Sequence, residues 1–157
     1  MLKEALEEDD KTGLSRCYNI MSQIYTVKRL DSMAFEWQLK EIELTEKYDL
    51  ENYNISQTYS QISSYYINTN QPEKALEALK KADATAYSPT QKISVQLEYV
   101  NYYSKFGDMQ AAEKILNECK TAFDQDKRLW SIKKRLYNIE YVYYLQSKQY
   151  PKALEAA

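Results

Sequence analysis

The sequence contains no histidine among its 157 residues, and this absence removes several kinds of site at once. Histidine is the usual general base, the usual zinc ligand and the usual pH switch of proteins. Serine and cysteine side chains therefore have no histidine that could activate them as nucleophiles, and no glycine-rich loop is present to cradle a phosphate. We expect no catalytic residue, no cofactor and no metal ion, so the protein is expected not to be an enzyme.

Glycine and proline are also scarce, at 2 and 3 residues. Turn-rich β architectures need many more of both, so a mostly helical chain is favoured. With 44% hydrophobic and 28% charged residues, the composition is that of a folded domain and not of a disordered chain. The two cysteines, Cys17 and Cys119, are too few and too far apart for a disulfide framework and are expected to be small buried apolar residues.

Long hydrophobic runs are missing as well. No segment approaches the roughly 20 apolar residues that span a bilayer, so no membrane span is expected. The net charge of −2 gives no general attraction to nucleic acid or to an anionic membrane. Unpaired cysteines and the lack of a signal peptide favour the cytoplasm, and a periplasmic location stays open if the parent protein is a membrane-bound sensor.

Charged clusters are local and are interpreted as solvated helix surface. The basic residues 127–128 and 133–135 lack interleaved aromatic side chains beyond Trp130, so we expect a solvated or subunit-bridging face and no nucleic-acid binding. Paired carboxylates such as Glu41 and Glu43 are interpreted as helix-surface charges with no apolar pocket to raise a pKa.

Tyrosine, in contrast, is abundant at 16 residues, and it takes part in an internal repeat. Four tyrosines are each followed by an alanine nine residues later, and the intervals between these alanines are 41, 37 and 41 residues. Four such coincidences exceed what chance gives at this tyrosine frequency, so the chain is predicted to consist of structural repeats. The pairs are Tyr25 and Ala34, Tyr66 and Ala75, Tyr103 and Ala112, and Tyr144 and Ala153.

The residues around each pair predict two helices per repeat. Large residues stand seven and four positions before the tyrosines, which places them on one helix face. The alanines open a second amphipathic helix with small residues where two helices touch. Ser88–Gln91 reads as a capping box, and Gly107 followed by Asp108 ends one helix and caps the next. We expect helices near 14–28, 32–47, 53–68, 72–86, 90–105, 109–123 and 128–147, with another from Tyr150.

The repeats are expected to form a single array over residues 1–157. Residues 2–8 look like the tail of a preceding repeat, and the helix pairs cover about 14–47, 53–86, 90–123 and 128–157. Terminal repeats of such arrays normally carry a polar capping face, and neither end shows one. We therefore expect a segment excised from a longer protein.

At these residues the chain resembles the tetratricopeptide repeat family. The family's aromatic position is filled by Tyr18, Tyr59 and Tyr137 but by Gln96 in the third unit, and the tyrosine and alanine are present in all four units. The usual closing proline is missing, and the repeats exceed the family's 34 residues. The resemblance implies an all-α fold, a right-handed superhelix of antiparallel helix pairs (an α-solenoid). The style is similar to the tetratricopeptide regions of bacterial signalling proteins.

The resemblance also implies a binding surface on the first helix of each pair, which lines the concave side in that family. A peptide or protein partner is expected there, with self-association as a further option. The alternative function is a regulatory region of a bacterial histidine kinase or helix-turn-helix transcription regulator. The predicted groove residues are Arg16, Asn19, Gln23, Gln57, Ser60, Ser64, Ile67, Leu97, Asn101, Arg135, Asn138 and Val142.

Overall fold

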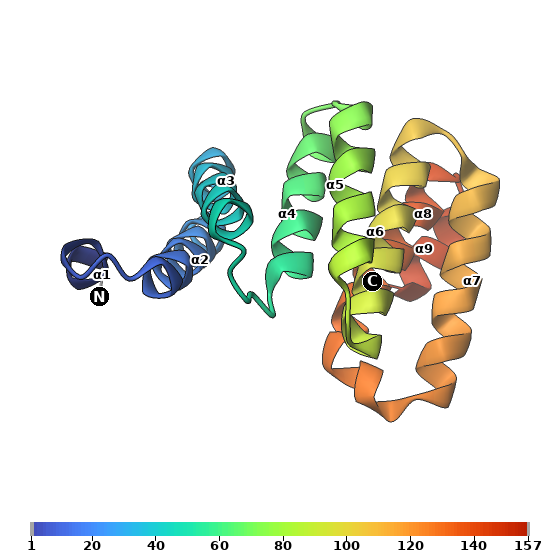
Figure 1. Cartoon of the computed structure of the whole chain (residues 1–157). Coiled ribbons are helices and arrows are strands. Elements are labelled where there is room, and N and C mark those ends of the chain that lie inside the picture. Colours follow the sequence, from blue (N-terminus) through green and yellow to red (C-terminus); the bar gives the residue numbers. More distant parts are fainter. Residues whose placement is uncertain (1, 157) are drawn as a thin grey trace.

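The computed structural model describes residues 2–156, and within them the chain is helical with short turns and has no β-strand. This confirms the predicted all-α solenoid (Figure 1). The helices are α1 (Leu2–Glu7), α2 (Lys11–Val27), α3 (Asp31–Tyr48), α4 (Ile55–Asn68), α5 (Pro72–Thr85), α6 (Pro89–Phe106), α7 (Met109–Gln125), the 3-10 helix η1 (Lys127–Ile132), α8 (Lys133–Gln146) and α9 (Tyr150–Ala156).

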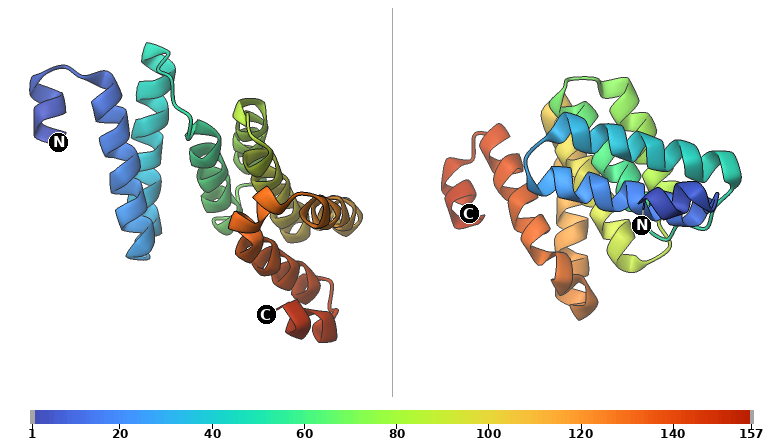
Figure 2. Two further views of the ribbon diagram at one scale, coloured as in Figure 1. Left: turned by 90° about the horizontal axis from the view of Figure 1, so that it is seen from below. Right: turned by 90° about the vertical axis from the view of Figure 1, so that its left-hand side faces the viewer.

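Consecutive helices pack as pairs: α2 with α3, α4 with α5, α6 with α7, and α8 with α9. The first helices of successive pairs also touch, because α4 contacts α6 and α6 contacts α8. Figure 1 shows α4 to α7 side by side along their length, whereas α2 and α3 are seen close to end-on. In the right-hand view of Figure 2, α2 and α3 cross over the second pair. The helix axes therefore change direction between the first and second pairs.

The turn inside each pair explains the nine-residue spacing between tyrosine and alanine. In the second unit the Gln71 backbone N–H donates to the Tyr66 carbonyl (2.9 Å), and Asn70 between them has a left-handed φ of 58°. The Ala75 backbone N–H then donates to the Gln71 carbonyl (3.0 Å), which begins the next helix. A residue with a left-handed backbone conformation stands four positions after each repeat tyrosine. These residues are Arg29, Asn70, Gly107 and Lys148.

The repeat alanines are buried in the helical packing, which agrees with the small residues predicted where helices touch. All four are buried, whereas the repeat tyrosines that precede them are half-buried. A small side chain at this position lets the second helix of a pair lie close to its neighbours, and enlarging it costs packing energy. The alanines are Ala34, Ala75, Ala112 and Ala153.

Substitutions at two of these left-handed positions are expected to change the stability of the protein in opposite directions. Arg29→Gly is expected to stabilise the protein by about 0.5–1 kcal/mol, because glycine adopts the left-handed conformation without the cost that a Cβ brings. Gly107→Ala is expected to destabilise it by about 1 kcal/mol. A Cβ on Gly107 would meet nothing within 4 Å, so its cost comes from the backbone alone. Urea unfolding of both variants measures the two changes, and a destabilising Arg29→Gly would contradict this account of the turn.

The boundaries of two helices differ from the prediction. A single helix was expected from residue 128, but η1 comes first and α8 begins at Lys133. The Asp126 side chain accepts from the Arg128 backbone N–H (2.9 Å) and ion-pairs with its guanidinium, which fixes a tight turn after α7. At the start, α2 begins at Lys11 because the Asp10 carboxylate caps it by accepting from the Gly13 N–H (2.9 Å).

The predicted caps around α6 and α7 are confirmed. Ser88 and Gln91 form the capping box at the start of α6, Gly107 ends α6 in the left-handed conformation, and the Asp108 carboxylate accepts from the Ala111 N–H (3.0 Å). Both cysteines are buried and free, as expected, and burial raises the pKa of the Cys119 thiol to about 12. Cys119 is therefore an unreactive core residue.

Among the described residues, two apolar clusters make up much of the core. One lies between α3, α4, α5 and α6, and its buried members are Ile42, Tyr59, Ile62, Ala78, Ala82, Ala86 and Val95. The other joins α6, α7, η1 and α8 and contains Leu97, Val100, Ala112, Leu116, Cys119, Phe123, Leu129, Leu136 and Tyr143.

Candidate partner-binding site

The predicted groove residues lie at very different depths in the structure. Three of them are interior, because α4 and α6 are covered by neighbouring helices on several sides: α4 contacts α3, α5 and α6, and α6 contacts α4, α5, α7 and α8. A partner therefore has no direct access to these three side chains. The buried ones are Ser60, Ile67 and Leu97; the half-buried ones are Asn19, Ser64, Asn101, Arg135 and Val142; the exposed ones are Arg16, Gln23, Gln57 and Asn138.

Three of the predicted residues meet at a carboxylate that was not among the predicted groove residues. Glu98 of α6 is only 2% exposed. Its Oε1 accepts hydrogen bonds from Ser64 Oγ (2.6 Å) and Asn101 Nδ2 (3.0 Å), and its Oε2 accepts from an Arg135 guanidinium nitrogen (2.7 Å). This cluster joins the first helices of three successive pairs, α4, α6 and α8, through one buried ion pair.

Two pockets lie beside α3, among the first pair, the turn that follows it and the start of the second pair, and we call them together the junction cleft. Their volumes are about 500 and about 470 Å³. Gln38 and Glu41, one turn apart on α3, each line one of them, so the two pockets follow α3. The first is lined by Thr12, Ser15, Arg16, Asn19, Ile20, Glu41, Leu50, Glu51, Asn52, Tyr53 and Asn54, and the second by Thr26, Asp31, Ser32, Ala34, Gln38, Gln61, Ser64, Tyr65, Asn68 and Thr69.

Glu41 lies at the centre of the polar contacts beside this cleft and is only 1% exposed. Its carboxylate accepts hydrogen bonds from Asn19 Nδ2 (3.1 and 3.2 Å), Asn52 Nδ2 (2.8 Å) and Thr58 Oγ1 (3.2 Å). Burial raises the pKa of Glu41, and these hydrogen bonds offset part of that rise. The interpretation of Glu41 as a helix-surface charge is wrong, because α2 and α4 cover this side of α3.

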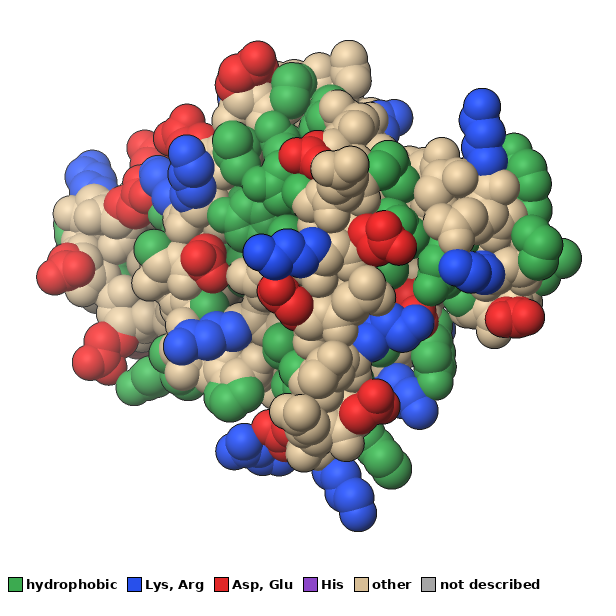
Figure 3. All heavy atoms as spheres, turned by 90° about the vertical axis from the view of Figure 1, so that its right-hand side faces the viewer, with side chains coloured by type: hydrophobic (Ala, Val, Ile, Leu, Met, Phe, Trp, Pro, Cys, Tyr) green, Lys and Arg blue, Asp and Glu red, His purple; other side chains and the backbone are tan. Residues whose placement is uncertain are grey.

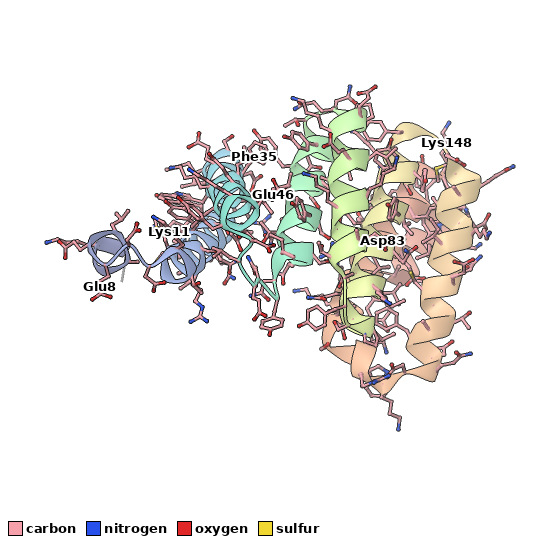
Figure 4. All side chains as sticks on the ribbon, in the orientation of Figure 1. Glu8, Lys11, Phe35, Glu46, Asp83 and Lys148 are labelled. Carbon is pink, nitrogen blue, oxygen red and sulfur yellow. The ribbon has the colours of Figure 1, made fainter. Side chains whose placement is uncertain are left out.

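The side of α3 turned toward α4 carries a second set of contacts, visible in Figure 4 around Phe35 and Glu46. The Phe35 ring stacks on Tyr65 with centroids 4.0 Å apart and meets the edge of Tyr66 at 5.3 Å. Glu46 accepts from the Tyr59 hydroxyl and pairs with Lys81 Nζ (3.0 Å). These aromatic and ionic contacts hold α3 against α4 and α5, so they fix the position of the helix that lines the junction cleft.

The basic residues near η1 are partly neutralised within the chain. Arg128 is paired with Asp126, Arg135 is paired with Glu98, and Lys133 Nζ lies over the rings of Trp130 (5.6 Å) and Tyr137 (5.4 Å). On the face shown in Figure 3, side chains of both charges are interspersed and neither sign forms a continuous patch. This arrangement resembles a solvated protein surface more than the phosphate-binding face of a nucleic-acid-binding protein.

The described part of the chain shows neither a membrane span nor a metal site. Among residues 2–156 no helix is long and apolar enough to cross a membrane. In the same part of the chain no group of three or more cysteine, aspartate or glutamate side chains is arranged to hold a metal ion.

Together these features define a class of protein, an α-solenoid whose successive helix pairs are tied together by buried polar contacts. The sequence model of the family described as 26S proteasome subunit RPN7 matches residues 26–156, and the chain belongs to this family. No curated protein and no solved structure gives a significant match.

The family match refines the expectation drawn from the repeats. A helical-repeat protein is confirmed, but the family is RPN7 and not specifically the tetratricopeptide family. The alternative of a bacterial signalling region receives no support from this match. Membership in a longer array stays a prediction.

Glu41 was wrongly predicted to be a surface charge and Glu98 was not predicted as a site residue, although the sequence carried a signal for each. Positions 34, 38, 41 and 45 of α3 share one helix face, and all four side chains are buried. Glu98 likewise stands three residues after Val95 and between apolar residues of α6. A charged residue on an otherwise core-facing helix stripe needs a partner inside the protein, and that criterion would have identified both.

Proposed function

We propose that this chain is a non-catalytic helical scaffold that holds protein partners within a multisubunit assembly of the 26S proteasome type. The observation that carries the proposal is the match of residues 26–156 to the 26S proteasome subunit RPN7 family. An α-solenoid suits this role because it presents a long surface built from many helices.

We propose further that the partner contacts the junction cleft. Its lining is rich in amide and hydroxyl groups, which donate and accept hydrogen bonds and so suit a peptide backbone. Arg16 and Asn19 of the predicted groove line its first pocket, Ser64 lines the second, and exposed Gln23 donates to Asn19 Oδ1 (2.7 Å). The rim also carries apolar side chains, whose surface a bound partner would remove from water. They are Ile20, Leu50 and Tyr53.

The assembly proposal is tested by isolating the 26S proteasome from cells that carry a tagged copy of this protein in place of the untagged one. We expect the tagged protein to migrate with proteasome peptidase activity on native gels and in sedimentation. Migration only as a free monomer, under conditions that keep the 26S particle intact, would contradict the proposal.

The junction cleft is tested in the same cells with the double variant Ile20→Ala, Tyr53→Ala, which removes two rim side chains of its first pocket. Both side chains are exposed, so the variant is expected to fold normally and to lower the amount of protein bound in the assembly by roughly tenfold if the pair includes one interface hot spot. The matched control is Glu113→Ala, Lys114→Ala, which removes two exposed side chains from α7, far from the cleft. Equal incorporation of both variants would place the partner elsewhere on the solenoid.

A further inference from the structure

Among the residues whose burial the structure describes, three glutamates are buried, and they differ in how their charge is compensated. Glu98 pairs with Arg135 and Glu140 pairs with Lys120, each at 2.7 Å. The exposed fractions of Glu41, Glu98 and Glu140 are 1%, 2% and 6%. Within the part of the chain that the structure describes, Glu41 has only neutral hydrogen-bond donors and no lysine or arginine within ion-pair distance.

A buried carboxylate without a cation is costly, because three neutral hydrogen bonds replace only part of the hydration it loses. Glu41 also lines the first pocket of the junction cleft, whose volume of about 500 Å³ leaves room for a side chain to enter. Glu140 lines a pocket of about 370 Å³ as well, but Lys120 already supplies its cation. The missing positive charge and the open space therefore occur at the same place.

We propose that this pocket receives a lysine or arginine side chain of the protein that the scaffold holds. The identity of the partner rests on the proposed function. The preference of the pocket for a cation rests only on the residues that line it. The entering cation takes over from Asn19 as a donor to the Glu41 carboxylate. Asn19 is half-buried in the same pocket, and its Oδ1 keeps Gln23 as a hydrogen-bond donor (2.7 Å).

The remaining lining of the pocket suits such a side chain. Ile20 and Leu50 offer apolar surface to the methylene stem, and Glu51 adds a second carboxylate at the exposed edge. Arg16 also lines the pocket, but it is exposed, so solvent and salt screen its repulsion. An anionic group is disfavoured, since it would lie beside both Glu41 and Glu51.

The test is an NMR titration of the full chain with methylguanidinium and n-butylammonium, which represent the ends of arginine and lysine. Methylurea is the matched neutral probe. We expect both cations to shift the amide signals of Asn19 and Asn52 in a saturable way and methylurea to leave them unchanged. In Glu41→Gln, which keeps the size of the side chain, binding of the cations is expected to weaken by roughly tenfold or more.

The control variant is Glu43→Gln, which removes an exposed carboxylate two residues away on the same helix and is expected to bind as the unaltered protein does. Equal shifts with methylurea, or undiminished binding by Glu41→Gln, would overturn the inference. If Glu41→Gln does not fold, the contrast between the cations and methylurea on the unaltered protein decides. No partner protein takes part in this titration. A negative titration therefore does not bear on association with the proteasome, and a negative association experiment does not bear on the titration.

Discussion

Replacing Arg135 with methionine is expected to destabilise the protein by about 3 kcal/mol. The guanidinium is the only cation that the described structure places against the buried Glu98 carboxylate, so its loss leaves a buried negative charge held by Ser64 and Asn101 alone. The value lies at the lower end of the range for broken buried ion pairs because the Arg135 side chain is itself 34% exposed. Urea unfolding followed by circular dichroism measures the change.

Two further variants separate the ion pair from general effects on α8. Lys134→Met removes a neighbouring exposed charge and is expected to change stability by less than about 0.5 kcal/mol. The double variant Glu98→Gln, Arg135→Met removes both charges and is expected to recover most of the loss, because no unpaired buried charge remains. Equal losses in Arg135→Met and in the double variant would show that packing of the arginine stem, and not charge, accounts for the effect.

The fold could be predicted from the sequence because its signals are local. Each repeat carries its turn within ten residues, from the tyrosine carbonyl through the left-handed residue to the alanine, so one short spacing marks all four helix pairs. The capping box at Ser88 and Gln91 is equally local. Helix order and pairing follow directly from such signals, since adjacent helices joined by tight turns can hardly pack in another way.

The candidate site could not be predicted to the same depth because it depends on contacts between units. Periodicity places Ser64, Asn101 and Arg135 on corresponding faces, but it does not reveal that all three point at one carboxylate. The change of direction between the first two pairs, which leaves the junction cleft, likewise follows from packing in three dimensions and has no short sequence signal.

The buried polar contacts suggest how the solenoid keeps its shape. The Glu41 cluster joins α2, α3, the following turn and α4, and the Glu98 cluster joins α4, α6 and α8. Hydrogen bonds are directional, so these clusters fix the register of one helix pair on the next more closely than apolar contacts alone. A partner that binds between two pairs then meets a preformed surface, which lowers the entropic cost of binding.

Replacing Leu97 with alanine is expected to destabilise the protein by about 3 kcal/mol, within the 2–5 kcal/mol that large-to-small core substitutions cost. Leu97 is 0% exposed and packs in the cluster that joins α6, α7, η1 and α8, so the substitution leaves a cavity in the middle of the array. Urea unfolding measures the loss. Asn138→Ala, at an exposed position of the same predicted groove, is the control and is expected to stay within about 0.5 kcal/mol of the unaltered protein.

The same two variants distinguish a residue that acts through the core from a residue that contacts the partner directly. If Leu97 acts only through the core, Leu97→Ala loses partner binding in proportion to its unfolded fraction and binds normally at low temperature, where it is folded. A surface residue that contacts the partner loses binding while the protein stays folded. Weak binding by fully folded Leu97→Ala would contradict its interior position, because a side chain without exposed surface can reach a partner only through a change in the helices around it.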